Sequence, residues 1–311
     1  MKNKLNIIYM GSGLYGSLVL EELDNTWIDI KEIYVKSKQI ISRKNSSELF
    51  FKEYNNDTRL HRISRFSEID IKTIENSAPD LILVASFGLI LPESILRIPT
   101  YGVINIHPSL LPKYRGPSPI STAIIEGQKF TGVTIMKMVN ELDAGPIIEQ
   151  EKIEIDYNLN SNELGIELFT IGAQKLNLLF PKFVENEITE HTQNNSEATY
   201  TKIIKKTDGH INLQDTVEEI YRKYRAYNHW PGIFSYWNNK RIIFKELKIN
   251  NKMNIGKNLL GKVENLKNGS LVINARDGQL LVSNLQIEGS KAMNAPVFVN
   301  GRPGIIGEFI N

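Results

Sequence analysis

The stretch DLILVASFG, residues 80–88, decides the fold of this chain. Its apolar run from Leu81 to Ala85 is too short for a helix and shows no alternation of polar and apolar side chains. Such a run is typical of a strand that is buried on both faces, as strands are inside a parallel sheet. We therefore expect a sheet of this kind, with helices covering both of its faces.

The segments around this strand alternate between strand and helix patterns. LNIIYMG (5–11) and IDIKEIYVK (28–36) are apolar strands, and residues 12–25 and 66–79 have the pattern of short helices. Because this order is typical of a doubly wound sheet, the sequence predicts an α/β fold with a Rossmann-like, mostly parallel sheet. Sites in such sheets lie in the loops that follow the carboxyl ends of the strands.

One further strand carries polar side chains that a buried strand does not need. In TYGVINIH (100–107), the alternation along a strand places Asn105 and His107 on the same face. Pro108 and Pro112 then fix two φ angles in the loop that follows. The two side chains therefore point at the same ligand or void, beside a loop held in one irregular path.

A second polar turn follows the next strand, residues 131–138. This turn, LDAGPI (142–147), contains Asp143. An aspartate ahead of Ala-Gly is a common turn former, and a lone histidine is usually hydrogen-bonded to backbone. An amide, an imidazole and a carboxylate in two adjacent loops favour catalysis instead, so Asn105, His107 and Asp143 are our candidate catalytic residues.

Composition limits the chemistry that this chain can perform. Its 311 residues, 41% of them hydrophobic, are enough for two domains. With no cysteine, the chain has no disulfide, thiolate zinc site or cysteine nucleophile. Its five histidines are scattered, so we expect no metal. It has no apolar run of about 18 residues and no leader pattern at its start, so we expect a cytoplasmic protein without membrane contact.

The second half of the chain has a different pattern. A long helix is expected over residues 160–186, interrupted late by Pro181, and a polar, poorly patterned segment follows it. One more helix and several short alternating strands, separated by Gly and Asn turns, predict a small, OB-like β-barrel. We therefore divide the chain into a catalytic domain (1–185), a linker (186–207) and a C-terminal barrel domain (208–311).

Charge is distributed unevenly between the halves. Residues 206–311 hold 15 Lys and Arg against 9 Asp and Glu, while residues 1–205 hold 22 against 26. A basic C-terminal half favours a polyanionic partner. In KYRAYNHWPG (223–232), Arg225 belongs either to a charged helix face closed by an aromatic plug or to a phosphate contact. The basic segment 36–65 is either a solvated loop or a nucleic-acid contact.

Gly11, Gly13 and Gly16 form the pattern GxGxxG between the first strand and the first helix. This pattern is typical of a dinucleotide-binding turn, but glycines at such a turn can also serve only the close packing of helix on strand. A dinucleotide-dependent dehydrogenase would leave HPSLLP and LDAGP without a role. We therefore prefer the packing interpretation.

Together, these motifs resemble a known family. NIHPSLLPKYRGPSPI (105–120), followed by TGVTIMKM and LDAGPI, resembles the catalytic domain of folate-dependent formyltransferases. YRAYNHWPG, the dipeptide Asp277–Gly278 and LQIEGSKAM are similar to the C-terminal half of members that act on initiator methionyl-tRNA. The resemblance implies transfer of the formyl group of 10-formyltetrahydrofolate to the methionine amino group, for translation initiation. A sugar-nucleotide N-formyltransferase and a non-catalytic RNA-binding protein are the alternatives.

The resemblance also assigns roles to residues and implies a metal-free monomer. It supports Asn105, His107 and Asp143 as the catalytic set. The residues expected beside the folate are Ser109, Leu110, Leu111 and Pro112, together with Phe87, Gly88 and Leu89 of the loop SFGLILP. The family's usual tRNA-facing patterns, Pro-Asp-x-Pro and Gly-Arg-Gly, are absent, so Arg43, Lys44 and Arg225 are the candidates for tRNA contacts.

Overall fold

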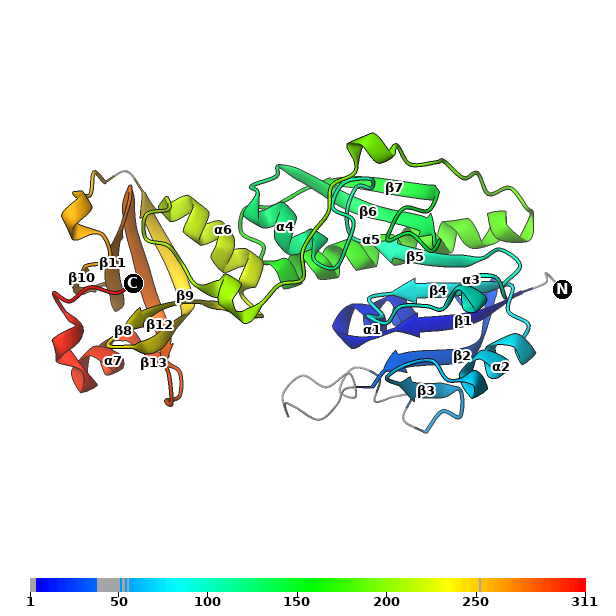
Figure 1. Ribbon diagram of the computed structural model, residues 1–311, viewed down its shortest axis with the longest axis horizontal. Coiled ribbons are helices and arrows are strands. Elements are labelled where there is room, and N and C mark those ends of the chain that lie inside the picture. Colours follow the sequence, from blue (N-terminus) through cyan, green and yellow to red (C-terminus); the bar gives the residue numbers. More distant parts are fainter. Residues whose placement is uncertain (1–3, 38–50, 52–53, 55, 252) are drawn as a thin grey trace. The chain divides into compact units, whose positions relative to one another are not determined.

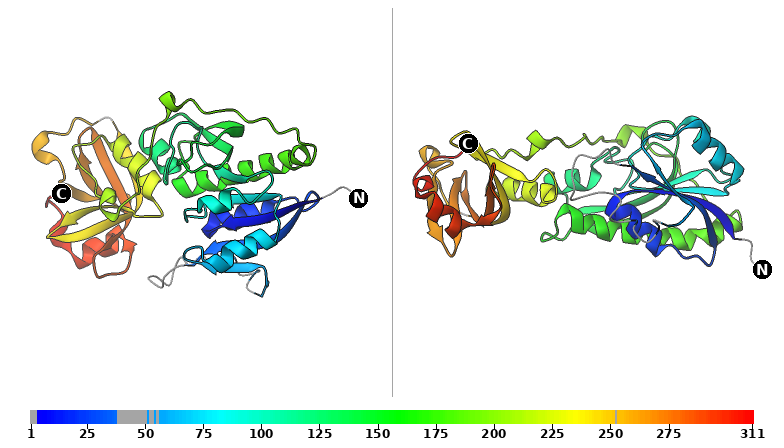
Figure 2. Two further views of the ribbon diagram at one scale, coloured as in Figure 1. Left: turned by 45° about the vertical axis from the view of Figure 1, so that its right-hand side comes forward. Right: turned by 90° about the horizontal axis from the view of Figure 1, so that it is seen from below.

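The structure is a computed structural model that describes residues 4–37, 51, 54, 56–251 and 253–311. The chain forms two compact units (Figures 1 and 2). Unit 1 comprises Met1–Pro119, Phe130–Glu154 and Leu164–Thr201, and unit 2 comprises Ile120–Lys129, Ile155–Glu163 and Lys202–Asn311. Unit 1 thus keeps the chain up to residue 201, beyond the predicted catalytic domain, and two short earlier segments belong with the C-terminal residues.

Unit 1 is built on a sheet in the order β3-β2-β1-β4-β5-β6-β7. Its strands are β1 Leu5–Gly11, β2 Ile28–Lys36, β3 Leu60–Ile63, β4 Leu81–Ala85, β5 Val103–His107, β6 Phe130–Lys137 and β7 Ile147–Glu154. Neighbouring strands from β3 to β5 are parallel, and β6 is antiparallel to both of its neighbours. Every residue of β4 is buried. The predicted mostly parallel sheet is therefore confirmed.

Helices cover both faces of this sheet (Figure 2). The helices of the first part of the chain are α1 Gly13–Glu22, α2 Glu68–Asn76, α3 Glu93–Leu96, α4 Pro119–Ile125 and α5 Ser161–Val184. On one face, α1 meets α5 through the stacked rings of Tyr15 and Phe169, 4.8 Å apart. On the other face, Ile74 of α2 and Ile95 of α3 pack in one apolar cluster with Val103 of β5. Since Val103 shares its face with Asn105 and His107, these two residues point toward the α2 and α3 side.

The glycine pattern after β1 is explained by packing. A Cβ atom on Gly16 would lie 2.8 Å from the carbonyl carbon of Gly11 and 3.2 Å from the Ala85 oxygen. The Tyr9 hydroxyl donates to the Gly16 carbonyl at 2.6 Å, so a tyrosine ring occupies the space beside the turn. Helix α1 can approach the sheet this closely only with glycine at position 16.

Two segments of unit 1 differ from the sequence-based expectation. Residues 60–63, expected within a solvated loop, form the edge strand β3 on β2. An edge strand is held by main-chain hydrogen bonds on one side, so it needs no apolar run. Helix α5 continues through Pro181 to Val184, because this proline falls in the last turn, where it removes one backbone bond and few residues follow.

Unit 2 contains the predicted small β-barrel. Its sheet has the order β10-β11-β12-β9-β8, with β13 paired to β12. These strands are β8 Ile233–Trp237, β9 Lys240–Asn251, β10 Val263–Lys267, β11 Ser270–Ala275, β12 Gly278–Ile287 and β13 Met293–Asn294. The C-terminal residues join the two edge strands, because Asn311 exchanges hydrogen bonds with Tyr236 and Val263 bonds to Gly307 and Glu308. Closure of this kind removes the exposed sheet edges.

Several of the remaining elements were not predicted from the sequence. Helix α6, Val217–Tyr227, was expected and begins with a capping box between Thr216 and Glu219. Helix α7, Ala295–Gly301, was missed, although Asn294 caps it by accepting from Val297 N. Residues 304–310, GIIGEFI, have the pattern of a last short strand, but this segment instead contains part of the short helix η6, Pro303–Ile305, and Phe309, which forms an isolated bridge with Lys262. The other short helices are η3 Asn195–Glu197, η4 Lys206–Gly209 and η5 Lys257–Leu259. Among the described residues, no helix is both long and apolar enough to cross a membrane.

Candidate active site

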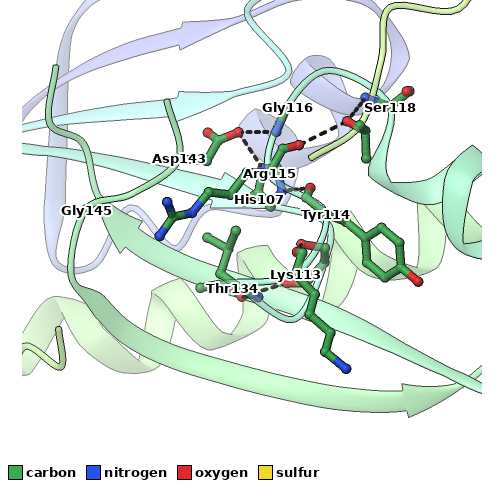
Figure 3. Close-up of polar contacts among 12 residues, drawn as sticks. His107, Lys113, Tyr114, Arg115, Gly116, Ser118, Thr134, Asp143 and Gly145 are labelled. Atoms are coloured by element: carbon green, nitrogen blue, oxygen red, sulfur yellow. Dashed lines mark hydrogen bonds and ion pairs between the residues drawn. The ribbon is translucent and has the colours of Figure 1, made fainter. Parts of the chain in front are cut away.

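The structure brings His107 and Asp143 together at the carboxyl end of β5 (Figure 3). His107 Nδ1 lies 3.7 Å from Asp143 Oδ2. The same carboxylate oxygen accepts a hydrogen bond from the backbone N–H of Gly116 at 2.7 Å. Both side chains are largely buried, with 5% and 12% of their surfaces exposed. The two loops singled out in the sequence therefore form one site within unit 1.

The tautomer of His107 follows from its second contact. Nε2 lies 3.0 Å from the backbone oxygen of Tyr114. Because a carbonyl oxygen only accepts hydrogen bonds, Nε2 must carry the proton. Neutral His107 therefore presents the lone pair of Nδ1 to the Asp143 side. A proton arriving at Nδ1 would meet a carboxylate oxygen 3.7 Å away.

Burial lowers the pKa of His107 below its ordinary value of 6.5. The Asp143 carboxylate and the hydrogen bond to Tyr114 act in the opposite direction and favour the protonated ring. His107 is thus neutral at pH 7 and lies beside a charge that stabilises its protonated form. This is the environment of a group that takes up a proton during a reaction and releases it afterwards.

Asn105 occupies the position that its strand predicts, two residues before His107 on β5. Its side chain is half-buried, and no hydrogen bond joins its amide to any residue that the structure describes. A half-buried amide in this position can donate to a ligand oxygen and accept from a ligand N–H. The candidate catalytic residues Asn105 and His107 thus lie on β5, and Asp143 lies in the turn between β6 and β7.

Backbone strain is concentrated in these loops. Apart from asparagine and glycine, the described residues with positive φ are Ala78, Ser86 (52°), Tyr114 (60°) and Asp143 (49°). Ser86 begins the loop after β4, and Tyr114 and Asp143 lie in the two loops of the site. Left-handed φ costs a non-glycine residue about 1–3 kcal/mol and is often found at functional sites.

Two polar side chains missed by the sequence-based analysis hold the proline-rich loop after β5. Thr134 of β6 is fully buried; its hydroxyl donates to Ser109 O at 2.6 Å and accepts from Leu111 N at 3.2 Å. Gln150 Nε2 of β7 donates to Leu111 O and to Thr134 Oγ1, both at 2.8 Å. The only signal for Thr134 in the sequence was a hydroxyl within the apolar strand TGVTIMKM.

The residues expected beside the folate divide into buried and accessible groups. Ser109 and Leu111 are 1% and 3% exposed, and the Ser109 hydroxyl donates to Lys113 O at 2.7 Å. Phe87 is 3% exposed and packs against Phe66 in the core beneath its loop, so its ring has little free surface. The more accessible positions are Gly88, Leu89, Leu110 and Pro112.

Of the three candidate tRNA residues, the structure describes only Arg225. Arg43 and Lys44 lie outside the described residues. Arg225 is 6% exposed, and its guanidinium donates to the backbone oxygens of Leu159 and Asp156 and lies over the Tyr157 ring. These contacts use Arg225 inside unit 2, so its helix face is a packed one. Trp230 is 53% exposed, so it does not close this helix face as the aromatic plug of the first alternative.

No group of three or more metal-binding side chains occurs among the described residues. The polar groups that Asn105, His107 and Asp143 bring to the site are an amide, an imidazole and a carboxylate. Such a set can polarise a carbonyl oxygen and move a proton, which is the chemistry of acyl-type transfer to an amine.

Comparisons with known proteins agree with this chemistry. The profile described as formyl transferase matches residues 4–176, and that of the formyl transferase C-terminal domain matches residues 203–303. The methionyl-tRNA formyltransferase of Caldicellulosiruptor saccharolyticus is 34% identical over 304 residues, covering 96% of this chain and 97% of its own. That of Clostridium acetobutylicum is 31% identical over 304 residues, covering 96% of both chains.

Solved structures share the fold. An N-formyltransferase from Helicobacter canadensis, in complex with folinic acid and dTDP-3-aminofucose, has a TM-score of 0.64 at 19% identity, covering 90% of this chain and 99% of its own. HypX from Aquifex aeolicus, in complex with tetrahydrofolic acid, has a TM-score of 0.63 at 16% identity. The match covers 96% of this chain, which spans about half of HypX, 47%. On the family profile and on the full-length relatives, this chain belongs to the formyl transferase family.

Proposed function

We propose that this enzyme transfers the formyl group of 10-formyltetrahydrofolate to the amino group of methionine on initiator methionyl-tRNA. The observation that carries the proposal is the buried His107–Asp143 pair beside the amide of Asn105. The relatives that match over nearly the full length, including the C-terminal unit, are methionyl-tRNA formyltransferases. Our assignment to translation initiation rests on those relatives.

The geometry supports a proton-transfer role for His107. When the methionine nitrogen attacks the formyl carbon, the new C–N bond forms and the nitrogen must lose a proton. Nδ1 of His107 accepts it, and the resulting imidazolium is stabilised by Asp143, 3.7 Å away. When the bond between the formyl carbon and N10 breaks, N10 takes that proton, so the ring returns to its neutral form.

The amide of Asn105 supports the other half of the reaction. The attacked formyl oxygen becomes negatively charged, and a donor aimed at it supplies the main stabilisation. An N–H of His107, on the same strand face, is a second candidate donor to this oxygen. Since its Nε2–H is bonded to Tyr114 O, a neutral ring has no N–H left for the oxyanion. We therefore assign the oxyanion to Asn105 and the proton to His107 and Asp143.

The accessible positions Gly88, Leu89, Leu110 and Pro112 are proposed to border the folate, while Ser109, Leu111 and Phe87 support them from beneath. For tRNA we propose that its sugar-phosphate backbone contacts unit 2, where eleven of the described lysines and arginines are exposed. These are Lys129, Lys202, Lys205, Lys206, Lys240, Lys245, Lys248, Lys257, Lys267, Arg276 and Lys291. A monomer is sufficient, because unit 1 supplies every proposed catalytic group, and a role in translation initiation implies the cytoplasm.

The test offers the purified protein 10-formyltetrahydrofolate with either methionyl-tRNA or an amino-sugar nucleotide. We expect only the methionine amino group to be formylated. Replacing His107 with alanine should reduce kcat by about 10²-fold to 10⁴-fold with little change in tRNA affinity. Formylation of the sugar alone would instead establish the alternative substrate, and wild-type turnover by His107→Ala would remove His107 from the mechanism.

A further inference from the structure

Beneath the site, the side chain of Arg115 is fully buried. Its ion pair with Glu141 is long, 3.7 Å, and the Glu141 side chain is 62% exposed. Its close partners are uncharged: Nη2 of Arg115 donates to Gln193 Oε1 at 2.8 Å and to Asn195 Oδ1 at 2.7 Å. Burying a cation among neutral acceptors is costly. Apolar residues would fill the same space at lower cost, so this arrangement calls for a functional explanation.

Gln193 connects that cation to the turn that carries Asp143. Its Oε1 accepts from Arg115, while its Nε2 donates to the backbone oxygens of Asp143 and Gly145, at 2.8 and 2.7 Å. Gln193 itself is 6% exposed. Because Asp143 has a positive φ, its turn needs outside contacts to stay in this conformation. The Gln193 amide supplies two of them.

The backbone around Arg115 holds the other side of the site. Tyr114 supplies the oxygen that binds His107 Nε2, and Gly116 supplies the N–H that binds the Asp143 carboxylate. Between them, Arg115 N donates to Thr199 O at 2.9 Å, and Thr201 N donates to Arg115 O at 2.7 Å. Residues 199–201 therefore fix the backbone that contacts both His107 and Asp143.

We propose that Arg115 and Gln193 are a positioning pair that holds the Asp143 turn at the distance from His107 that proton transfer requires. The pair acts through backbone and does not touch the reacting atoms. This inference rests on the proposed function, because it assigns the pair to the proton-transfer step. It also gives residues 191–201, which the composition marks as part of a linker, a role in the active site.

Gln193→Glu separates positioning from simple stabilisation. A glutamate keeps the acceptor for Arg115, now as an ion pair, but removes both donors to the Asp143 turn. We expect the thermal midpoint to stay at or above the wild-type value. We expect kcat to fall about tenfold to 100-fold through loss of geometry, with KM for both substrates within about twofold. Wild-type kcat in this stable variant would overturn the proposal.

Asn177→Asp is the matched control. Asn177 of α5 also donates to one backbone oxygen, Glu22 O, and accepts from one backbone N–H, that of Asp24, in the same unit. The same amide-to-carboxylate change there should leave kcat at the wild-type value. If Gln193→Glu and Asn177→Asp lose activity to the same extent, the loss comes from a general effect on the structure, and the positioning role is overturned.

A second measurement does not depend on turnover. In Gln193→Met, which adds no charge, NMR titration should show the His107 ring with a lower pKa than in the wild-type protein, because Asp143 has moved away. The His107 signal is assigned by its loss in His107→Gln. An unchanged ring pKa would overturn the positioning role. If the wild-type protein does not formylate methionyl-tRNA, the proposed function fails, while this titration still tests the pair.

Discussion

Replacing Asp143 with asparagine removes the charge that faces His107 and little else. The side-chain oxygen of asparagine can still accept from the Gly116 N–H, which now lies 2.7 Å from Asp143 Oδ2, so the loop keeps this contact. At 3.7 Å and an effective dielectric constant of about 20, the lost attraction for a protonated His107 is about 4 kcal/mol. If the imidazolium forms in the transition state, kcat should fall about 10³-fold.

The assay is single-turnover formylation of methionyl-tRNA at saturating concentrations of both substrates, which reports the chemical step. Asp80→Asn is the control, because Asp80 Oδ2 also accepts one backbone N–H, that of Asn6, at 2.7 Å, in the same unit. The control should keep wild-type turnover. If Asp143→Asn retains kcat within about tenfold of wild type, the carboxylate charge does not stabilise the imidazolium, and the proposed proton path is incorrect.

Three further predictions concern the loop, the pH dependence and the tRNA. Thr134→Val leaves the Leu111 N–H and the Ser109 oxygen without their partner and should destabilise unit 1 by about 2–4 kcal/mol in urea unfolding. Thr131→Val on the same strand should cost less than about 1 kcal/mol, and equal costs would contradict the bracing role of Thr134. Burial lowers the pKa of His107, so on acidification the unfolded chain takes up a proton at this histidine before the folded protein does. The stability that the neutral, buried ring allows is therefore fully present above about pH 6.5 and is lost as the pH falls toward the pKa of the folded protein. The acid limb of kcat/KM, which reports groups of the free enzyme, should accordingly lie below pH 6.5 and disappear in His107→Gln. An acid limb at higher pH would argue against His107 as the base. KM for tRNA should rise steeply with salt while KM for the folate stays constant; a salt-independent KM for tRNA would argue against backbone contacts through unit 2.

Local sequence patterns were sufficient to predict the sheet and the proximity of the candidate catalytic residues. An apolar run such as Leu81–Ala85 is a property of adjacent residues, and the proximity of Asn105 and His107 follows from the period of a strand. The proximity of Asp143 to His107 follows less directly. Strand β6 pairs with β5, and the turn after β6, which carries Asp143, lies beside β5. These features depend on short stretches of chain, so they could be read before the structure.

The contacts that hold the site were not predictable in the same way. Arg115 and Gln193 are 78 residues apart, and neither lies in a pattern that distinguishes a buried polar side chain from a solvated one. A charged side chain such as Arg115 is typical of an exposed loop, and the polar composition around Gln193 predicted a linker. Such side chains are buried only because their partners reach them in the folded chain, and no local pattern records that pairing.

The costs in unit 1 converge on one place. Left-handed φ at Ser86, Tyr114 and Asp143, a fully buried Arg115 and a buried His107 are each unfavourable for folding. Glycine turns and apolar side chains could connect and pack the same strands without these costs, as the turn at Gly16 does elsewhere in this unit. Conflicts between local preference and fold are expected where function requires them. A reaction that moves one proton from one nitrogen to another near pH 7 needs a proton acceptor that is held at a fixed position. A rigid, costly frame around His107 supplies that position before either substrate binds.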